Sequence, residues 1–214
     1  MSRPARVSPA QILAAAALEF AERGYAGARV DRIARRARVN KAMLYYHFRS
    51  KEELYRTLLR QTFERAGERL RAIAASRAAP AEKLDRAIEG IAAFVAEYAF
   101  FPSIMLREVA EGGAHLDRRT LAALATVPAA VGAIVAQGTA ARAFREVHPL
   151  AAYFSIFVPV VVYLAGAPIR QELAARHLVN GAALSANAFV GHMQDAARRA
   201  LAPDPATLQG PPHR

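Results

Sequence analysis

Apolar residues recur every three to four positions along most of this chain, which is the spacing of an amphipathic α-helix. The first stripe follows a capping box at Ser8-Pro9-Ala10-Gln11 and ends at Gly24, a residue type that often terminates helices. Its apolar members are Ile12, Leu13, Ala16, Ala17 and Phe20. No run alternates with the two-residue period of a β-strand. The pattern therefore predicts an all-α protein.

Two short helical segments follow with almost no linker between them. The first runs from Val30 to Ala37 and the second from Lys41 to His47, and the second turns Leu44 and Phe48 inward. The three residues 38–40 form the turn, which is long enough only for two helices that cross steeply. Asn40 is a favourable N-cap and sets the start of the second helix. The spacing predicts a helix-turn-helix.

The outward face of the second short helix mixes small, aromatic and cationic side chains. A short helix of this kind fits the major groove of DNA. The residues expected on this face are Lys41, Ala42, Met43, Tyr45, Tyr46 and His47.

The string VNKAMLYYHFRSKEELY resembles the DNA-binding signature of TetR-type transcriptional regulators, and FAERGY and IARRA resemble the first two helices of the same domain. The likeness covers Ile12 to Leu58. It implies a three-helix DNA-binding domain joined by a long helix to a helical ligand-binding and dimerisation domain. We expect these domains at residues 1–53 and 54–201, with a flexible tail at 202–214.

Two positions depart from the family pattern. Most members carry Gly in the turn where this chain has Arg38, and a non-Gly residue at positive φ costs energy. Either Arg38 tolerates that conformation or the turn differs. Ala28 stands where many members have a capping Thr or Ser, so we expect a weak cap on the second helix.

The resemblance implies a set of DNA contacts. Tyr45, Tyr46, His47 and Lys51 match positions that hold the phosphate backbone. Lys41 is placed to reach a base edge or a phosphate, and Ala42 and Met43 to contact thymine methyls. Arg29 and Arg32 are expected at the backbone or an adjacent base, and Asn40 completes the set. The alternatives are that Met43 belongs to the core and that one of the two tyrosines packs inward.

The distribution of charge also favours DNA binding by the N-terminal part of the chain. The formal net charge is +11, and residues 1–60 hold 13 Lys and Arg against five Asp and Glu, a net +8. Phosphate neutralisation needs positive charge placed in this way. The chain has no Cys, and its six His show no HxxxH spacing, so we expect neither a metal site nor a cofactor. The N-terminus carries no apolar signal segment, and we expect a cytoplasmic protein.

The remainder of the chain also has helical periodicity. A long helix begins at a second capping box, Ser50-Lys51-Glu52-Glu53, and Pro80 follows the next break. Pro128 is expected to kink the third later helix, and Gly181 to interrupt the last. The later helices are expected within 82–100, 102–111, 119–144, 150–167 and 173–201.

Residues 149–169 are an uncharged run that raises a membrane question. Pro159, Ser155, Tyr153 and Tyr163 weaken that interpretation. A helix that is apolar all round must be covered, either by the core of one subunit or by a second copy. In the resembled family, late helices from two subunits form a four-helix interface, so we expect a homodimer and no membrane partner.

A ligand-binding lining is expected in the second domain, mainly from aromatic residues and Met. The candidates are Tyr98, Phe101, Met105, Arg107, Glu108, Tyr153 and Phe157, with Glu111 and Tyr163 beside them. Any one of these aromatics can equally be core. Arg107 and Glu108 are charged groups flanked by apolar residues, which must be exposed, paired or in a pocket.

These observations favour a homodimeric TetR-type repressor that binds double-stranded operator DNA and is released by a small apolar or amphipathic ligand. One alternative is a constitutive DNA-binding protein with no effector. Another is a helical enzyme, which the absence of a Cys nucleophile, a Gly-rich phosphate loop and a Gly-x-Ser-x-Gly motif disfavours.

Overall fold

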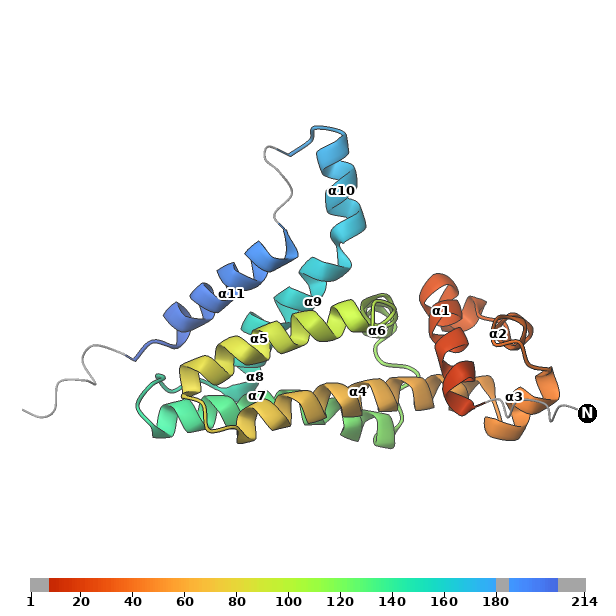
Figure 1. Cartoon of the computed structure of the whole chain (residues 1–214), viewed down its shortest axis with the longest axis horizontal. Helices are drawn as coiled ribbons and strands as arrows, with labels where there is room; N and C mark the ends of the chain where they lie inside the picture. Colours follow the sequence, from red (N-terminus) through yellow and green to blue (C-terminus); the bar gives the residue numbers. More distant parts are fainter. Residues whose placement is uncertain (1–7, 180–184, 204–214) are drawn as a thin grey trace, which may run out of the picture. The chain divides into compact units, whose positions relative to one another are not determined.

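A computed structural model describes residues 8–179 and 185–203, and in these ranges the chain forms helices and loops without a β-strand (Figure 1). The all-α prediction is confirmed. The helices are α1 (Pro9–Gly27), α2 (Val30–Arg36), α3 (Lys41–His47), α4 (Lys51–Ala75), α5 (Pro80–Glu97), α6 (Phe101–Ala110), α7 (Arg118–Ala140), α8 (Pro149–Ala152), the π-helical turn η1 (Tyr153–Phe157), α9 (Val158–Ala165), α10 (Ala167–Ala175) and α11 (Ala186–Leu201).

The chain forms two compact units, each assembled from two stretches of sequence. Unit 1 comprises residues 1–64 and 98–124, and unit 2 comprises residues 65–97 and 125–214. Helices α4 and α7 therefore each contribute residues to both units. Helix α6 belongs to the same compact unit as the helix-turn-helix. The boundary between the DNA-binding and ligand-binding domains, predicted at residues 53 and 54, is a functional division and stays a prediction.

Unit 1 is built on the predicted stripe of α1. Ile12, Ala16 and Phe20 are fully buried, and Ser8 accepts a hydrogen bond from the backbone N–H of Gln11 at 3.4 Å, as the capping box predicts. The Gln11 side chain bonds to the next helix, because its Nε2 donates to the Ala37 carbonyl at the end of α2 at 2.9 Å. This bond fixes the first and second helices to each other.

The turn between α2 and α3 resolves the question raised by Arg38. Arg38 has a φ of 53°, so a residue with a side chain occupies the left-handed region that glycine usually fills. The Val39 N–H donates to the Ala34 carbonyl at 3.0 Å, which closes the end of α2 in the way a glycine-terminated helix closes. The turn keeps its shape, and Arg38 tolerates the strain.

Unit 2 packs α5 against α9 and α11, with α7 contributing Val131 and Ile134 to a fully buried core. Lys83 is a buried cation in this unit. Its Nζ donates to the Ala74 carbonyl at 2.8 Å and to the Gln137 Oε1 at 2.6 Å. A lysine that hydrogen-bonds a final carbonyl of α4 complements the negative end of the helix dipole, so its burial is compensated.

The apolar run predicted as a helix at 150–167 is helical without a break from Pro149 to Ala165, so the prediction is confirmed to within two residues. Its consecutive elements are α8, the wider turn η1 and α9, and Gly166 separates α9 from α10. Pro159 lacks the N–H that would donate to the carbonyl four residues earlier, and the wide turn lies directly before it. Helix α10 was not predicted.

By length and composition, α7 is the one single helix among the described residues that would suit a membrane span, with a mean hydropathy of 1.7 over its most apolar window. Residues 149–165 would be long and apolar enough to span a membrane only together with α10, and the two are bent by 57°. Helix α7 is partly covered by the chain itself, because Val131 and Val135 lie in the core of unit 2.

The last helix is shorter than predicted. It begins at Ala186, where the Ser185 hydroxyl accepts from the Ala188 N–H at 3.1 Å, and its Val190 and Met193 are buried. Leu173 belongs instead to α10. The predicted interruption at Gly181 and the predicted flexible tail from residue 204 onward lie outside the described residues.

Replacing Arg38 by Gly should raise the free energy of unfolding by about 1 kcal/mol, because a side chain at left-handed φ costs roughly that much. Chemical denaturation measures the change. The matched control is Arg35→Gly, which places glycine inside the exposed face of α2 and should lower stability by a similar amount. Equal destabilisation by both substitutions would show that Arg38 carries no strain.

Candidate nucleic-acid interface

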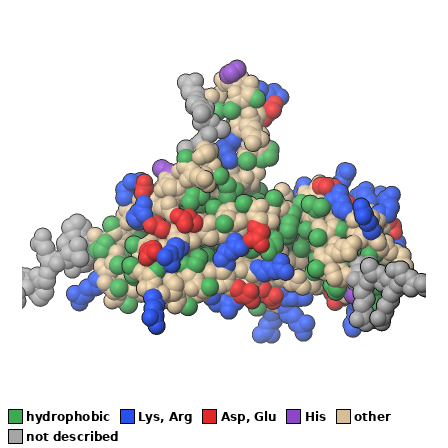
Figure 2. Space-filling model, in the orientation of Figure 1, with side chains coloured by type: hydrophobic (Ala, Val, Ile, Leu, Met, Phe, Trp, Pro, Cys, Tyr) green, Lys and Arg blue, Asp and Glu red, His purple; other side chains and the backbone are tan. Residues whose placement is uncertain are grey.

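The outward face of α3 is as exposed as the sequence predicts. Tyr46 is 82% exposed, Tyr45 41% and Met43 38%, and the shorter Ala42 is exposed too. Both tyrosines therefore face solvent, and Met43 does not belong to the core. His47 is half-buried, and its ring lies 5.2 Å from that of Tyr46. Figure 2 shows Lys and Arg side chains gathered over α2 and the neighbouring end of α1.

The inner face and the start of α3 hold that surface in place. Leu44 is fully buried and Phe48 is 5% exposed, so α3 is anchored through two side chains one turn apart. Asn40 acts as the predicted N-cap, because its Oδ1 accepts from the Met43 N–H at 2.7 Å. The Oδ1 atom of Asn40 is therefore used to cap α3.

Lys41 opens α3 and forms an ion pair with α2. Its Nζ lies 2.9 Å from Oδ1 of Asp31, and both side chains are more than half exposed. Hydrogen bonding to the Asp31 carboxylate raises the pKa of Lys41 above its ordinary value. An exposed pair of this kind contributes little to stability and can be exchanged for a stronger anion such as a phosphate.

A buried carboxylate organises the start of α2. Glu19 on α1 is 1% exposed, and its Oε1 accepts from the Arg29 N–H at 3.2 Å and from the Arg32 Nε at 2.6 Å. Arg29 is the N-cap of α2 and makes no side-chain capping bond, as the weak cap predicts, and the carboxylate holds this residue through its backbone N–H instead. An anion at a helix N-terminus also complements the helix dipole. Sequence analysis missed Glu19, although it lies seven residues after Ile12 on the buried stripe.

Arg29 and Arg32 take different positions on this junction. The Arg32 guanidinium is bound to Glu19 and also donates from Nη2 to the Gly27 carbonyl at 2.8 Å. The Arg29 backbone begins α2 while its side chain is exposed. Arg32 therefore has a role within the domain, and Arg29 is the freer of the two for a DNA contact.

Lys51 also has partners within the domain. Its Nζ donates to the Tyr25 carbonyl at 2.9 Å and to the Ala28 carbonyl at 3.2 Å, and it lies 4.5 Å from the centre of the Tyr25 ring. An ammonium has three N–H donors, so one remains for a phosphate. The capping box of α4 is present as predicted, since the Ser50 hydroxyl accepts from the Glu53 N–H at 3.0 Å.

The residues expected to line a ligand site are divided between the two units. Tyr98, Phe101, Met105, Arg107 and Glu108 belong to unit 1, whereas Tyr153 and Phe157 belong to unit 2. Phe101 lies against Phe63, with ring centres 5.6 Å apart, and the rings of Tyr153 and Phe157 stack at 6.5 Å. Each group contributes to packing inside its own unit.

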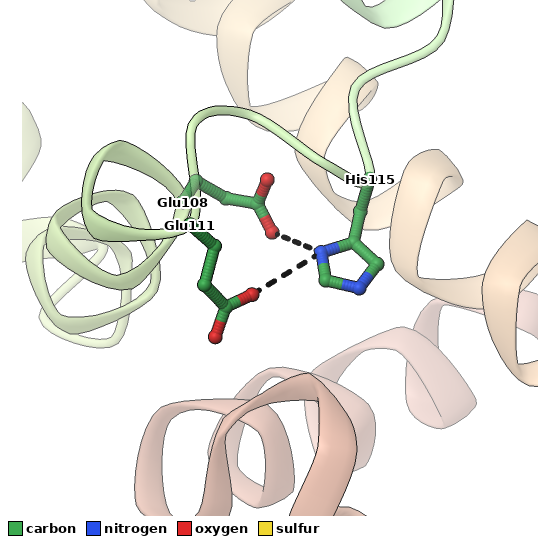
Figure 3. Close-up of side chains that lie close together, drawn as sticks. All are labelled: Glu108, Glu111 and His115. Carbon is green, nitrogen blue, oxygen red and sulfur yellow. Dashed lines mark hydrogen bonds and ion pairs between the residues drawn. The ribbon is translucent and has the colours of Figure 1, made fainter.

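Glu108 is buried and belongs to a polar cluster in unit 1 (Figure 3). Its Oε1 accepts from the Tyr55 hydroxyl at 2.7 Å and lies 2.8 Å from the Nδ1 of His115. Glu111 approaches the same Nδ1, with its Oε2 at 3.5 Å. Burial, reinforced by the bond to Glu108, raises the pKa of Tyr55. HxxxH spacing in the sequence does not identify this cluster, because two of its three members are glutamates.

Comparison with known proteins agrees with this geometry at the helix-turn-helix. Residues 12–58 match the family model described as bacterial regulatory proteins, tetR family. The chain is 45% identical over 58 residues, 27% of its length, to the transcriptional repressor SCO4008 of Streptomyces coelicolor. It is 30% identical over 141 residues, 63% of its length, to the transcriptional repressor NicS of Pseudomonas putida. The matched segments span 30% and 65% of these two relatives, less than two-thirds of each.

Among solved structures, the fold resembles the transcriptional regulator FadR of Bacillus subtilis in complex with stearoyl-CoA. The TM-score is 0.71 at 17% identity, and the alignment covers 91% of this chain and all of that one. At this level of identity the similarity shows the fold alone, and it extends over both the helix-turn-helix and the later helices.

Proposed function

This chain is a TetR-type helix-turn-helix protein, and from that premise we propose that it is a homodimeric transcriptional repressor released from its operator by a small apolar or amphipathic ligand. The exposed face of α3 is the observation that carries the proposal. The chemistry of that face suits groove binding, and the relatives named above are repressors.

The DNA contacts divide into two kinds. Tyr45, Tyr46 and His47 offer hydroxyl and imidazole donors on the open face of α3, which suits phosphate oxygens. Lys41 and Met43 occupy the first turn of α3, the part of a recognition helix that points most directly at base edges. Lys51 contributes a phosphate contact through its remaining donor, and Arg29 through its exposed side chain.

Replacing Lys41 by Ala should change which half-site bases are preferred, by roughly tenfold for a lost base contact. A selection from randomised DNA sites measures the preference. The matched control is Asp31→Asn, which removes the partner of Lys41 and leaves the ammonium in place. We expect that control to keep the base preference and bind all DNA more tightly. An unchanged preference in Lys41→Ala would assign Lys41 to the phosphate backbone instead.

Support for the homodimer comes from the apolar surface of unit 2. Phe154 is 62% exposed, and Leu150 and Val162 are each 48% exposed, on the consecutive elements α8, η1 and α9. Large apolar side chains gathered on neighbouring turns favour an interface. A second copy of the chain is the partner that a repressor of near-palindromic sites requires.

Phe154→Glu should convert a dimer to a monomer, because it places a charge in the proposed apolar interface. Analytical ultracentrifugation at micromolar concentration measures the change, and affinity for a full operator should fall much more than affinity for a half-site. The control is Val109→Glu on α6, which alters a residue that is 70% exposed in unit 1 and should leave the dimer intact. A monomeric unmodified protein would overturn the proposed assembly.

The effector is proposed as mainly apolar, because residues 149–169 of unit 2 carry aromatic and aliphatic side chains, Tyr153 and Phe157 among them, and no charge. By linkage, a ligand that weakens operator binding must bind less tightly to the DNA-bound protein. We expect hydrophobic compounds to raise the melting temperature and to release operator DNA. Compounds that raise the melting temperature without altering DNA affinity would favour the constitutive binder.

A further inference from the structure

We propose that Glu108, Glu111 and His115 form a binding site for a divalent transition-metal ion of the Zn²⁺ class. The three residues lie at the end of α6 and in the loop that leads to α7, all within unit 1 (Figure 3). One ligand atom from each residue lies within 4.8 Å of those of the other two. Imidazole with carboxylate is a donor set that such ions bind in proteins.

The spacing of the donor atoms suits one ion. Oε1 of Glu108 and Oε2 of Glu111 lie 2.8 Å and 3.5 Å from the same nitrogen, Nδ1 of His115. Around an ion with bonds of about 2.1 Å, adjacent ligand atoms lie about 3.0 Å apart in octahedral geometry and about 3.4 Å apart in tetrahedral geometry. The two distances to Nδ1 are close to these values, and one ligand atom from each glutamate lies within 4.8 Å of the other.

The burial of Glu108 gives an independent reason to expect a cation. The side chain is 1% exposed, and its second oxygen, Oε2, is buried with no hydrogen-bond partner among the described residues. A buried carboxylate whose lone pairs are incompletely satisfied is costly. A divalent ion bound by this group would compensate the charge, and rotation of the carboxyl can direct either oxygen toward the ion.

The surroundings orient the ligands as they do at known metal sites. The Tyr55 hydroxyl donates to Glu108 at 2.7 Å, and Arg56 Nε donates to the carbonyl of His115 at 3.0 Å. The His115 ring packs on Tyr25, with ring centres 4.0 Å apart. Hydrogen bonds to metal-binding groups from such outer residues tune affinity. The site is therefore supported on α4 and at the end of α1, as well as on α6.

A proton on His115 explains the geometry less completely than an ion does. One N–H at Nδ1 can point well at only one of the two carboxylates, whereas an ion binds both at once. The Glu111 side chain is 46% exposed and that of His115 is 19% exposed, so water has access to complete the coordination.

The full-length chain, purified without a histidine tag and dialysed against a chelator, should bind one equivalent of Co²⁺ with the visible absorption of a bound ion. Calorimetry with Zn²⁺ gives the affinity. Glu111→Gln and His115→Gln should each weaken binding by more than tenfold, and Tyr55→Phe, which removes only the outer hydrogen bond, should weaken it by about tenfold. Glu111→Gln is the decisive variant, because a half-exposed side chain can be replaced without loss of the fold, which circular dichroism checks.

The matched control is His192→Gln, which removes an exposed histidine from α11 in unit 2 and should leave Co²⁺ binding unchanged. Failure of the unmodified chain to bind an equivalent of metal would overturn the proposal. Equal binding by the unmodified chain and Glu111→Gln would do so too, since it would place the ion on other surface groups. No DNA enters the measurement, so its result is independent of whether the chain is a ligand-released repressor.

Discussion

The helix-turn-helix depends on the compensation of one buried negative charge. A carboxylate removed from water must be paired or hydrogen-bonded, and Glu19 satisfies this demand through the Arg29 N–H and the Arg32 guanidinium. These two bonds set where α2 begins and how it lies on α1. Gln11 then fixes the other end of α2 through the Ala37 carbonyl. With both ends held, the turn at Arg38 delivers α3 with Leu44 inward and its tyrosines outward.

Periodicity and capping chemistry predicted most of this fold because both are local. The stripe of α1, the cap at Asn40 and the capping box at Ser50 all involve residues within four positions of one another. The separate helix α10, which begins beside Pro168 after the break at Gly166, could not be read in this way. A proline is compatible with a helix start or an interrupted helix, and packing in unit 2 decides between them.

The polar partnerships were harder to foresee because they join distant residues. Glu19 meets Arg32 across 13 positions, and Tyr55 meets Glu108 across 53. A partial signal exists, since both glutamates fall on apolar stripes: Glu108 follows Ile104 by four residues, as Glu19 follows Ile12 by seven. Such a residue can be identified as buried and in need of a partner. Which partner it finds depends on the tertiary structure.

The position of Lys51 has a consequence for covalent chemistry at this amine. Its ammonium holds the two carbonyls of Tyr25 and Ala28 and faces the Tyr25 ring. Both carbonyls follow Gly24, where a φ of 67° and a ψ of 175° kink α1. Acetylation would remove the charge and two of the three N–H donors. Its first effect would be to loosen the junction between α1 and α4, before any phosphate is involved. Arginine at this position would keep the charge but not the shape, because a planar guanidinium cannot direct its donors as a compact ammonium does.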